Sequence, residues 1–210
     1  SITKQNSTFI LQMRSISRME IRINSYIPIT DVEGVGTRFA IWVQGCSMHC
    51  EGCANSHMWN FDGGTSYKLE DFIEIIKRYK DKIEGVTWLG GEPLEQIQAV
   101  TEISKAVQKL GLSVIVFTGY EFKDLESNVD FKELAKYTDI LIDGRYEQDK
   151  TDYSRAWVCS SNQNYYFLTN RYNESVIYEN KNKIEVRISP DNEVVLTGMG
   201  DFKELIEVMR

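Results

Sequence analysis

The sequence predicts an α/β fold, a partial (open) βα barrel with a β-rich carboxyl-terminal end. Between residues 38 and 146, short apolar segments alternate with amphipathic ones, and strand–helix alternation implies parallel strands with right-handed crossovers. The short segments are almost continuously apolar, as expected for strands that helices cover on both faces. After residue 150, polar turns separate short β-prone segments, which is typical of antiparallel pairing.

Two strand–helix units begin the barrel. Their expected elements are strand 38–45, helix 67–83, strand 85–90 and helix 93–111. Thr65 or Ser66 can cap the first helix, and Pro93 and Gly111 suit the start and end of the second. Each helix has one apolar face. These faces comprise Leu69, Phe72, Ile73, Ile76, Tyr79 and Ile83 in the first, and Leu94, Ile97, Val100, Ile103, Val107 and Leu110 in the second.

The second half of the chain continues this alternation and then becomes β-rich. The barrel elements expected here are strand 112–120, helix 131–138 and strand 139–146. The antiparallel strands expected after them are 164–172, 175–189 and 193–199, followed by a closing helix at 201–209. Residues 1–19 are polar and weakly patterned, so we expect an amino-terminal arm followed by one domain, residues 20–210.

The composition narrows the class of protein. A net charge of −7 disfavours nucleic acid as the main partner, because proteins that bind it usually carry a basic stripe. The chain has no apolar run long enough to cross a membrane and no pattern typical of a secretion signal. Three of the four cysteines are clustered, which does not suggest a disulfide framework. We therefore expect a protein of the reducing cytoplasm.

The cluster of cysteines is the strongest motif. Cys46, Cys50 and Cys53 follow the strand at 38–45, and only His49 and His57 could add imidazole ligands. Structural zinc usually takes two Cys-x-x-Cys pairs or one pair with histidines, and ferredoxin-type clusters take four cysteines. Three thiolates on a 4Fe-4S cluster would leave one iron open for chemistry. A structural zinc site and an accidental group of thiols are the alternatives.

Several segments resemble one known family. Residues 31–64, with the three cysteines, resemble the opening of glycyl radical enzyme activases, which belong to the radical S-adenosylmethionine (radical SAM) superfamily. The likeness is greatest to the activating proteins of anaerobic ribonucleotide reductase. "WLGGEPLEQ" (88–96) matches their glycine-glycine-glutamate segment, and three weaker segments, 117–125, 139–147 and 160–163, also resemble that group. The resemblance spans roughly residues 20–200 and implies a barrel of the radical SAM type.

The resemblance implies a reaction. Cys46, Cys50 and Cys53 would hold a 4Fe-4S cluster whose fourth iron binds S-adenosylmethionine. One electron, from a donor such as flavodoxin or ferredoxin, would cleave that cofactor to a 5′-deoxyadenosyl radical, which abstracts a hydrogen atom from a protein substrate, a glycyl radical enzyme. One alternative is a stand-alone enzyme that modifies a peptide or small molecule. Another is an electron carrier with Cys159 as fourth ligand, although a buried free thiol is the expected state of Cys159.

Further cofactor contacts are implied at Asn55, Trp59, Gly90, Gly91, Glu92, Thr118 and Asp143. The carboxylate of Glu92, or the backbone carbonyls beside it, would receive the cofactor's ammonium group, although Glu92 also suits a helix start. Thr118 would lie near the cofactor's methionine or ribose, or only end a strand. Asp143 would accept a hydrogen bond from ribose or substrate, or cap a turn. Trp59 would shield the cluster or stack on adenine.

Overall fold

The computed structural model describes residues 19–201 and Glu207. The predicted amino-terminal arm and closing helix therefore lie almost wholly outside the described residues. Within these residues, no helix combines the length and the apolar character that crossing a bilayer requires.

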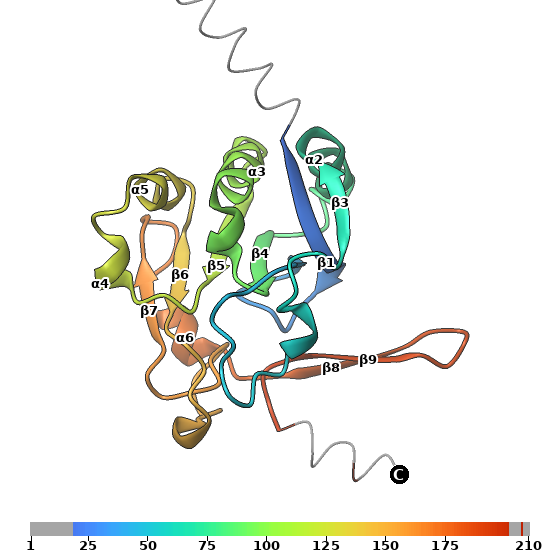
Figure 1. The fold of residues 1–210 in the computed structure, drawn as a ribbon, viewed down its shortest axis with the longest axis vertical. Coiled ribbons are helices and arrows are strands. Elements are labelled where there is room, and N and C mark those ends of the chain that lie inside the picture. The colour runs from blue at the N-terminus through green and yellow to red at the C-terminus, as the bar shows by residue number, and fades with distance from the viewer. Residues whose placement is uncertain (1–18, 202–206, 208–210) are drawn as a thin grey trace, which may run out of the picture.

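The central feature is a seven-stranded sheet with the order β3-β1-β2-β4-β5-β6-β7 (Figure 1). Its strands are β1 (Glu20–Thr30), β2 (Arg38–Val43), β3 (Thr65–Lys68), β4 (Gly85–Gly90), β5 (Ser113–Phe117), β6 (Ile140–Asp143) and β7 (Asn164–Phe167). The central strands β2, β4, β5 and β6 are parallel, whereas β1, β3 and β7 join antiparallel at the edges. The prediction of an α/β fold with a parallel centre is confirmed.

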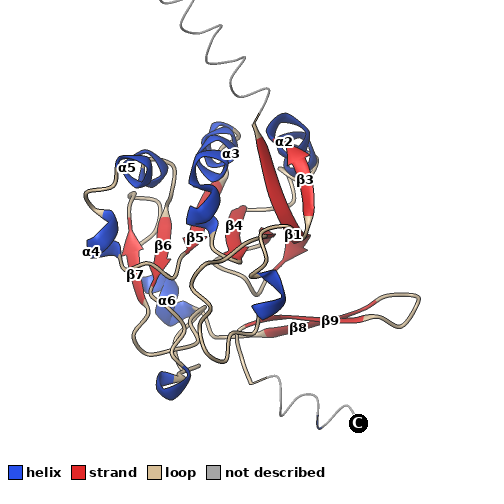
Figure 2. Cartoon of the chain, in the orientation of Figure 1, coloured by secondary structure: helices blue, strands red, loops and turns tan. Residues whose placement is uncertain are grey.

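Helices cover one face of the sheet (Figure 2). They are α2 (Leu69–Lys77), α3 (Ile97–Lys109), α4 (Phe122–Leu125) and α5 (Val129–Ala135). Because strand side chains alternate between faces, Phe39, Ile41 and Val43 of β2 pack in the core beneath these helices, and Ala40 and Trp42 point the other way. The main hydrophobic core lies on this face.

The other face is buried too, but mainly by loops. Residues 156–158 pack on Ile115 and Ile140, and Met58 of the 3-10 helix η1 (Ser56–Met58) packs on Trp42. The short helix α6 (Ser175–Glu179) adds Val176 to this layer. The expectation of helices on both faces holds only in small part, because loop residues bury most of the second face beside the short η1 and α6.

The helix predicted at 67–83 begins at Leu69 and ends at Lys77 in the structure. Residues 65–68 form the edge strand β3 against β1, and the helix α2 that follows has no side-chain cap, so the expected cap at Thr65 or Ser66 was wrong. The helix ends at Lys77, yet Ile83 still reaches the core through the turn that leads into β4. Sheet pairing by β1, a strand that the pattern did not single out, overrides the capping preference here.

The region predicted as a strand at 175–189 was partly wrong. Its first residues form α6, which an Asx turn precedes, because the Ser175 amide donates to Asn173 Oδ1 at 2.9 Å. Only Ile184–Ile188 forms a strand, β8, which pairs antiparallel with β9 (Val194–Gly198) in a separate hairpin. The other predicted elements that lie within residues 19–201 keep their type. The second predicted helix begins as the 3-10 helix η2 (Pro93–Gln96), and η3 (Gln148–Lys150) was not expected.

A buried arginine ties the amino-terminal ends of three parallel strands. The Arg38 guanidinium donates to Thr87 Oγ1 at 3.0 Å, to Ser113 Oγ at 2.6 Å and to the Val86 carbonyl at 2.6 Å. Burial lowers the Arg38 pKa to about 10, so the side chain stays charged at neutral pH. With this end occupied by a structural network, the carboxyl ends of the strands are left for the functional groups.

Candidate functional site

The cysteine loop is closed at its base by backbone pairing. Gly45 N–H donates to the Met58 carbonyl at 2.8 Å, and Cys46 N–H donates to the Trp59 carbonyl at 3.1 Å. The Gln44 amide also spans the loop, since Nε2 donates to the carbonyls of Met58 and Asn60. Sequence reasoning missed Gln44. Its signal was a polar residue directly after the apolar run 39–43 and shortly before the cysteines.

The three loop thiols are free, and backbone amides donate toward two of them. Cys46 is buried, and Cys50 and Cys53 are partly buried. Amides of Met48 and His49 donate to the Cys46 sulfur. Burial raises the pKa of the Cys46 and Cys50 thiols, and for Cys50 this outweighs the opposite effect of the nearby Arg145 guanidinium.

The three loop thiols have the ligand type of an iron–sulfur cluster. Among residues 19–201, no three His, Cys, Asp or Glu side chains lie close enough together to hold one metal ion. Three free thiols from one loop, with amide donors on Cys46 and Cys50, match the ligand type and outer hydrogen bonds of iron–sulfur proteins.

Gly90 ends β4 and Gly91 follows it, and both lie directly against the start of the cysteine loop. A Cβ on Gly91 would stand 2.2 Å from the Gly45 carbonyl oxygen, and a Cβ on Gly90 would stand 2.5 Å from the Val43 nitrogen. Glu92 N–H donates to the same Gly45 carbonyl at 2.8 Å. Only glycine permits this contact, so Gly90 and Gly91 bring the end of β4 against the segment that presents Cys46.

Glu92 joins the ends of β4 and β5. Its Oε1 accepts from the Leu94 amide and the Thr118 hydroxyl, both at 2.9 Å, and its Oε2 accepts from the Gly119 amide at 2.8 Å. Burial raises the Glu92 pKa to about 7 despite these donors. The structure thus brings together two predicted site residues, Glu92 and Thr118, in a closed network.

Asp143 makes a similar connection at the end of β6. Its Oδ2 accepts from the Phe122 amide at 2.7 Å, and its Oδ1 accepts from the Asn164 backbone amide at 3.2 Å and side-chain amide at 3.1 Å. The carboxylate is buried and links β6 to the start of α4 and to β7. The Asp143 carboxylate therefore accepts hydrogen bonds from neighbouring segments and not from its own turn.

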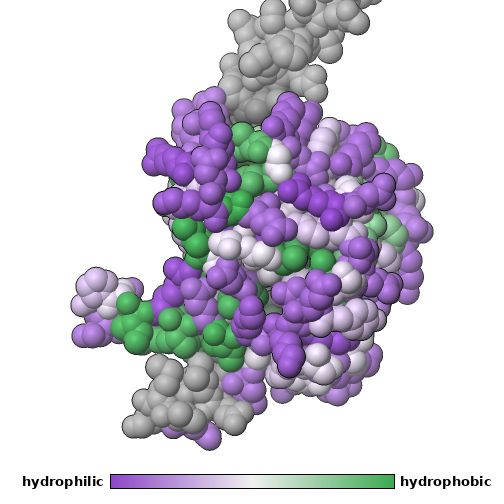
Figure 3. Space-filling model, turned by 180° about the vertical axis from the view of Figure 1, so that it is seen from behind, coloured by the Kyte–Doolittle hydropathy of each residue, from purple (hydrophilic) through white to green (hydrophobic). Residues whose placement is uncertain are grey.

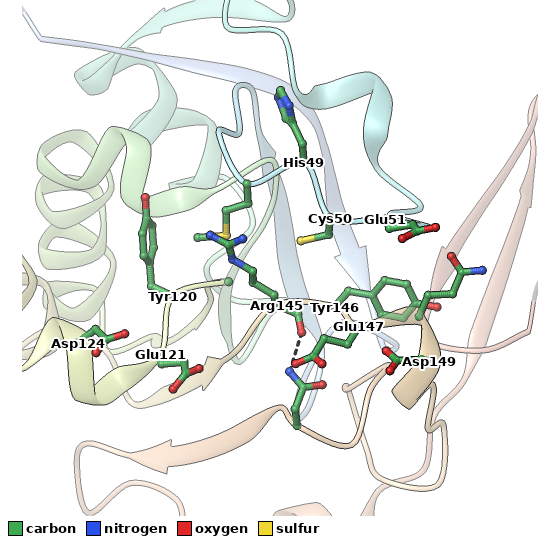
Figure 4. Close-up of a pocket in the computed structure, with 14 residues that line it drawn as sticks. His49, Cys50, Glu51, Tyr120, Glu121, Asp124, Arg145, Tyr146, Glu147 and Asp149 are labelled. Carbon is green, nitrogen blue, oxygen red and sulfur yellow. Dashed lines mark hydrogen bonds between the residues drawn. The ribbon is translucent and has the colours of Figure 1, made fainter.

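A pocket of about 940 Å³ opens beside the cysteine loop, which is within the usual range for small-molecule sites (Figure 4). Cys50 and Arg145 point into it, and Gly119 and Tyr120 line the wall after β5. The Arg145 carbonyl accepts from Asn162 Nδ2 at 2.8 Å, which fixes the loop that carries the guanidinium. Among the residues that line this pocket, Arg145 brings a guanidinium and His49 an imidazole.

Trp59 covers the outside of the cysteine loop. Its ring stacks on the exposed ring of His49 with centroids 4.5 Å apart and planes at 24°. The Trp59 indole N–H is buried and has no hydrogen-bond partner. Asn55 precedes η1, and its carbonyl accepts from the Met58 amide at 2.9 Å, whereas its side chain makes no capping bond. Neither Trp59 nor Asn55 lines the pocket.

Comparison with known proteins now identifies the family. Residues 32–166 match a protein family described as a 4Fe-4S single cluster domain, which is more than half of the chain. The chain belongs to this family. The matched region of this 4Fe-4S single cluster domain protein runs from the β1–β2 loop into β7 and contains the three loop cysteines, the Gly90–Glu92 segment, Thr118 and Asp143.

Three curated relatives of this protein carry the same name. The anaerobic ribonucleoside-triphosphate reductase-activating protein of Pasteurella multocida is 34% identical over 151 residues, which is 69% of this chain and 96% of the relative. Its namesake in Escherichia coli K12 is 34% identical over 67% of this chain and 94% of the relative. The phage T4 protein of that name is 34% identical over 65% of this chain and 87% of its own length. The predicted kinship with activating enzymes is confirmed.

The segment 32–38 of this family member packs against the second face and the hairpin. The Glu33 side chain is buried, and its Oε1 accepts from the Gly198 amide of β9 at 2.7 Å. Glu33 Oε2 has no partner, and burial raises the Glu33 pKa to about 7. Nearby, the Cys159 thiol donates to Met199 Sδ at 3.1 Å, so it lies against the end of β9 as a free thiol.

We expect Glu33 to make folding stability depend on pH. Because its pKa is raised from 4.5 to about 7, its stabilising contribution is complete below about pH 4.5 and is lost as pH rises through 7. The loss amounts to up to about 3 kcal/mol of unfolding free energy. The Glu33→Gln variant should therefore show a shallower fall in urea-unfolding free energy between pH 5 and 8 than the unchanged protein. Parallel pH profiles for the two proteins would contradict this role.

Proposed function

We propose that this protein is a radical SAM enzyme that activates a glycyl radical enzyme. The observation that carries the proposal is the single loop of three free thiols beside a large pocket, at the carboxyl ends of the parallel strands. Under this proposal, the sheet is the wall of an open βα barrel of the radical SAM type, and its second face lies toward the barrel interior.

Cys46, Cys50 and Cys53 would hold the 4Fe-4S cluster and leave one iron for S-adenosylmethionine. When bound and reduced by a low-potential donor such as flavodoxin or ferredoxin, this pair supplies a 5′-deoxyadenosyl radical. The protein's own task is then to hold the thiolates, orient the cofactor and limit the access of water. Trp59, stacked on His49 over the loop, suits the last of these tasks.

The strand ends would orient the cofactor. Both oxygens of Glu92 already accept hydrogen bonds within the chain, so we assign the cofactor's ammonium group to backbone carbonyls of the Gly90–Glu92 segment. Glu92, Thr118 and Asp143 are then positioning residues that fix the pocket wall. Arg145, which points into the pocket near Cys50, offers a guanidinium for a carboxylate of cofactor or substrate.

The substrate class follows from the relatives. Three relatives with 34% identity are named as activating proteins of anaerobic ribonucleoside-triphosphate reductase. We therefore propose a protein substrate of that class, from which a backbone hydrogen atom of one glycine is removed. Glu121 and Asp149, which line the pocket, are exposed, which leaves an approach for a loop of the partner.

The test is anaerobic co-incubation of the reconstituted protein with the reductase, S-adenosylmethionine and a reductant. We expect a glycyl radical signal in electron paramagnetic resonance, and the same mixture without S-adenosylmethionine is the control. Cofactor cleavage without a glycyl radical would remove the partner assignment and favour a stand-alone enzyme that acts on a peptide or small molecule. Absence of cofactor cleavage would remove the radical SAM assignment itself.

A further inference from the structure

Two features of the described chain have no role in the proposed function. One is the β8–β9 hairpin, on which Ile188 and Val194 are exposed (Figure 3). The other is a pair of polar side chains in η2, Glu95 and Gln96, which make hydrogen bonds to the cysteine loop and its base. Because these bonds reach the chain on either side of Cys46, the second feature bears on how this thiol is held.

The Gln96 side chain is inserted between strands β1 and β2, where the cysteine loop begins. Facing residues of an antiparallel pair normally exchange two N–H···O bonds. Here Gln44 N–H donates to the Arg22 carbonyl at 3.0 Å, whereas Arg22 N–H donates to Gln96 Oε1 at 2.8 Å. Gln96 Nε2 in turn donates to the Arg22 carbonyl at 2.8 Å and to the Gln44 carbonyl at 3.0 Å. The Gln96 amide thus stands in the place of one ladder bond and links Gln44 to η2.

A carboxamide is the side-chain group that suits this place. It has one oxygen acceptor and two N–H donors, and Gln96 directs all of them to backbone groups of Arg22 and Gln44. Gln96 is also the N-cap residue of α3, but its side chain makes no capping bond there. Serine or aspartate is usual at such a position, because the side chain then caps the helix. The Gln96 side chain therefore serves the base of the cysteine loop and not the helix.

Glu95 holds the chain on the other side of Cys46. Its Oε1 accepts from the Ser47 hydroxyl and, at 3.3 Å, from Ser47 N–H. Between the contacts of Glu95 and Gln96, Glu92 N–H donates to the Gly45 carbonyl at 2.8 Å. Hydrogen bonds from one short segment, 92–96, therefore bracket Cys46.

We propose that Glu95 and Gln96 are positioning residues that hold Cys46 where a 4Fe-4S cluster requires its sulfur. The inference rests on the proposed function, because it takes Cys46 as a ligand. Cys46 is the buried thiol of the loop, so the backbone on either side of it decides where its sulfur can reach. Groups that orient metal ligands from outside typically change metal affinity by about 10- to 100-fold when they are removed.

The first test measures how fast iodoacetamide alkylates Cys46 in the full-length protein before reconstitution, by mass spectrometry of the cysteine peptides. Gln96→Leu keeps the approximate size and charge of the side chain and removes its hydrogen bonds. Cys46 should react about tenfold faster, because local opening of the loop then breaks fewer hydrogen bonds. The rate at Cys159, whose sulfur contacts Met199, should stay unchanged.

The matched control is Gln98→Leu. Gln98 lies in α3 two residues further along the chain and is exposed, so the same chemical change there should leave the Cys46 rate unchanged. A second pair tests Glu95, which is partly exposed. Glu95→Ala should increase the Cys46 rate more than Glu95→Gln, because both remove the carboxylate charge but only the second keeps an oxygen acceptor for Ser47.

The second test follows the cluster itself after anaerobic reconstitution. Gln96→Leu should lose iron to a chelator at least about tenfold faster than the unchanged protein, in line with the effect of other groups that orient metal ligands. Its reduced cluster should also give an altered electron paramagnetic resonance signal. Gln98→Leu should show neither change.

Two results would overturn the proposal. One is an unchanged Cys46 rate in Gln96→Leu, and the other is an equal increase at Cys46 and Cys159, which would indicate a general loss of folding. If Gln96→Leu does not fold, equal Cys46 rates in the two Glu95 variants overturn it instead. The alkylation rates require no cofactor, so the inference can fail while the unchanged protein still produces a glycyl radical. Absence of cofactor cleavage in the unchanged protein would remove the proposed function and leave these rates as they are.

Discussion

Replacing any one of Cys46, Cys50 or Cys53 with alanine should abolish formation of 5′-deoxyadenosine. Each substitution removes one of the three thiols that a single loop offers to the cluster. A cluster with two protein ligands loses iron, because metal affinity depends on the full set of deprotonated ligands. Iron content and 5′-deoxyadenosine, measured after anaerobic reconstitution, should fall together.

Cys159→Ala is the matched control for this experiment. Cys159 is also a free cysteine, but its sulfur contacts Met199, and burial raises its pKa to about 12. This variant should keep its iron and its cleavage activity. Loss of iron in Cys159→Ala would indicate a fourth protein ligand and favour an electron carrier. Normal activity in a variant of the loop cysteines would contradict the ligand assignment.

Gly91→Ala should also reduce cofactor cleavage strongly, by about 100-fold, because a misplacement of about 1 Å near a reacting centre has an effect of that size. The added methyl group would meet the Gly45 carbonyl oxygen at 2.2 Å and its carbon at 2.8 Å. Both are backbone atoms, so the Gly90–Glu92 segment and the base of the cysteine loop must separate. The cleavage rate at saturating S-adenosylmethionine measures the effect.

Gly111→Ala is the control for the general cost of replacing a glycine. Gly111 has a positive φ of 81°, but a Cβ there would meet nothing within 4 Å. We expect a loss of about 1 kcal/mol of stability from the left-handed backbone and an unchanged cleavage rate. Equal loss of activity in both glycine variants would show that stability, not the contact with Gly45, is responsible.

The apolar pattern predicted the parallel centre of the fold but not its edges. Strands β4 and β5 are mainly apolar, almost fully buried runs between helical patterns, and such runs have few alternative structures. In contrast, β3 is four polar or half-buried residues whose pairing depends on β1, a distant partner. The helix α6 depends on a local Asx turn at Asn173, which is weaker than the β propensity of Val176 and Ile177.

The candidate site was predictable as a set of residue types and less so as a set of contacts. The spacing of Cys46, Cys50 and Cys53 predicts a cluster with one open iron, and this stays a prediction. The role of Glu92 was not predictable in the same way, because its partners Thr118 and Gly119 lie on another strand. Gln44 was missed because its partners Met58 and Asn60 lie across the loop. Sequence spacing can indicate candidate ligands, whereas hydrogen bonds between residues far apart in the chain become visible only in the folded structure.

The closed network around Glu92 also bears on how the protein matures. Its donors and acceptors all come from the chain itself, through Leu94, Thr118 and Gly119. We therefore expect the strand ends to fold independently of iron and sulfide, so that assembly of the cluster can follow folding. A protein damaged by oxygen would need a new supply of iron and sulfide rather than resynthesis of the polypeptide.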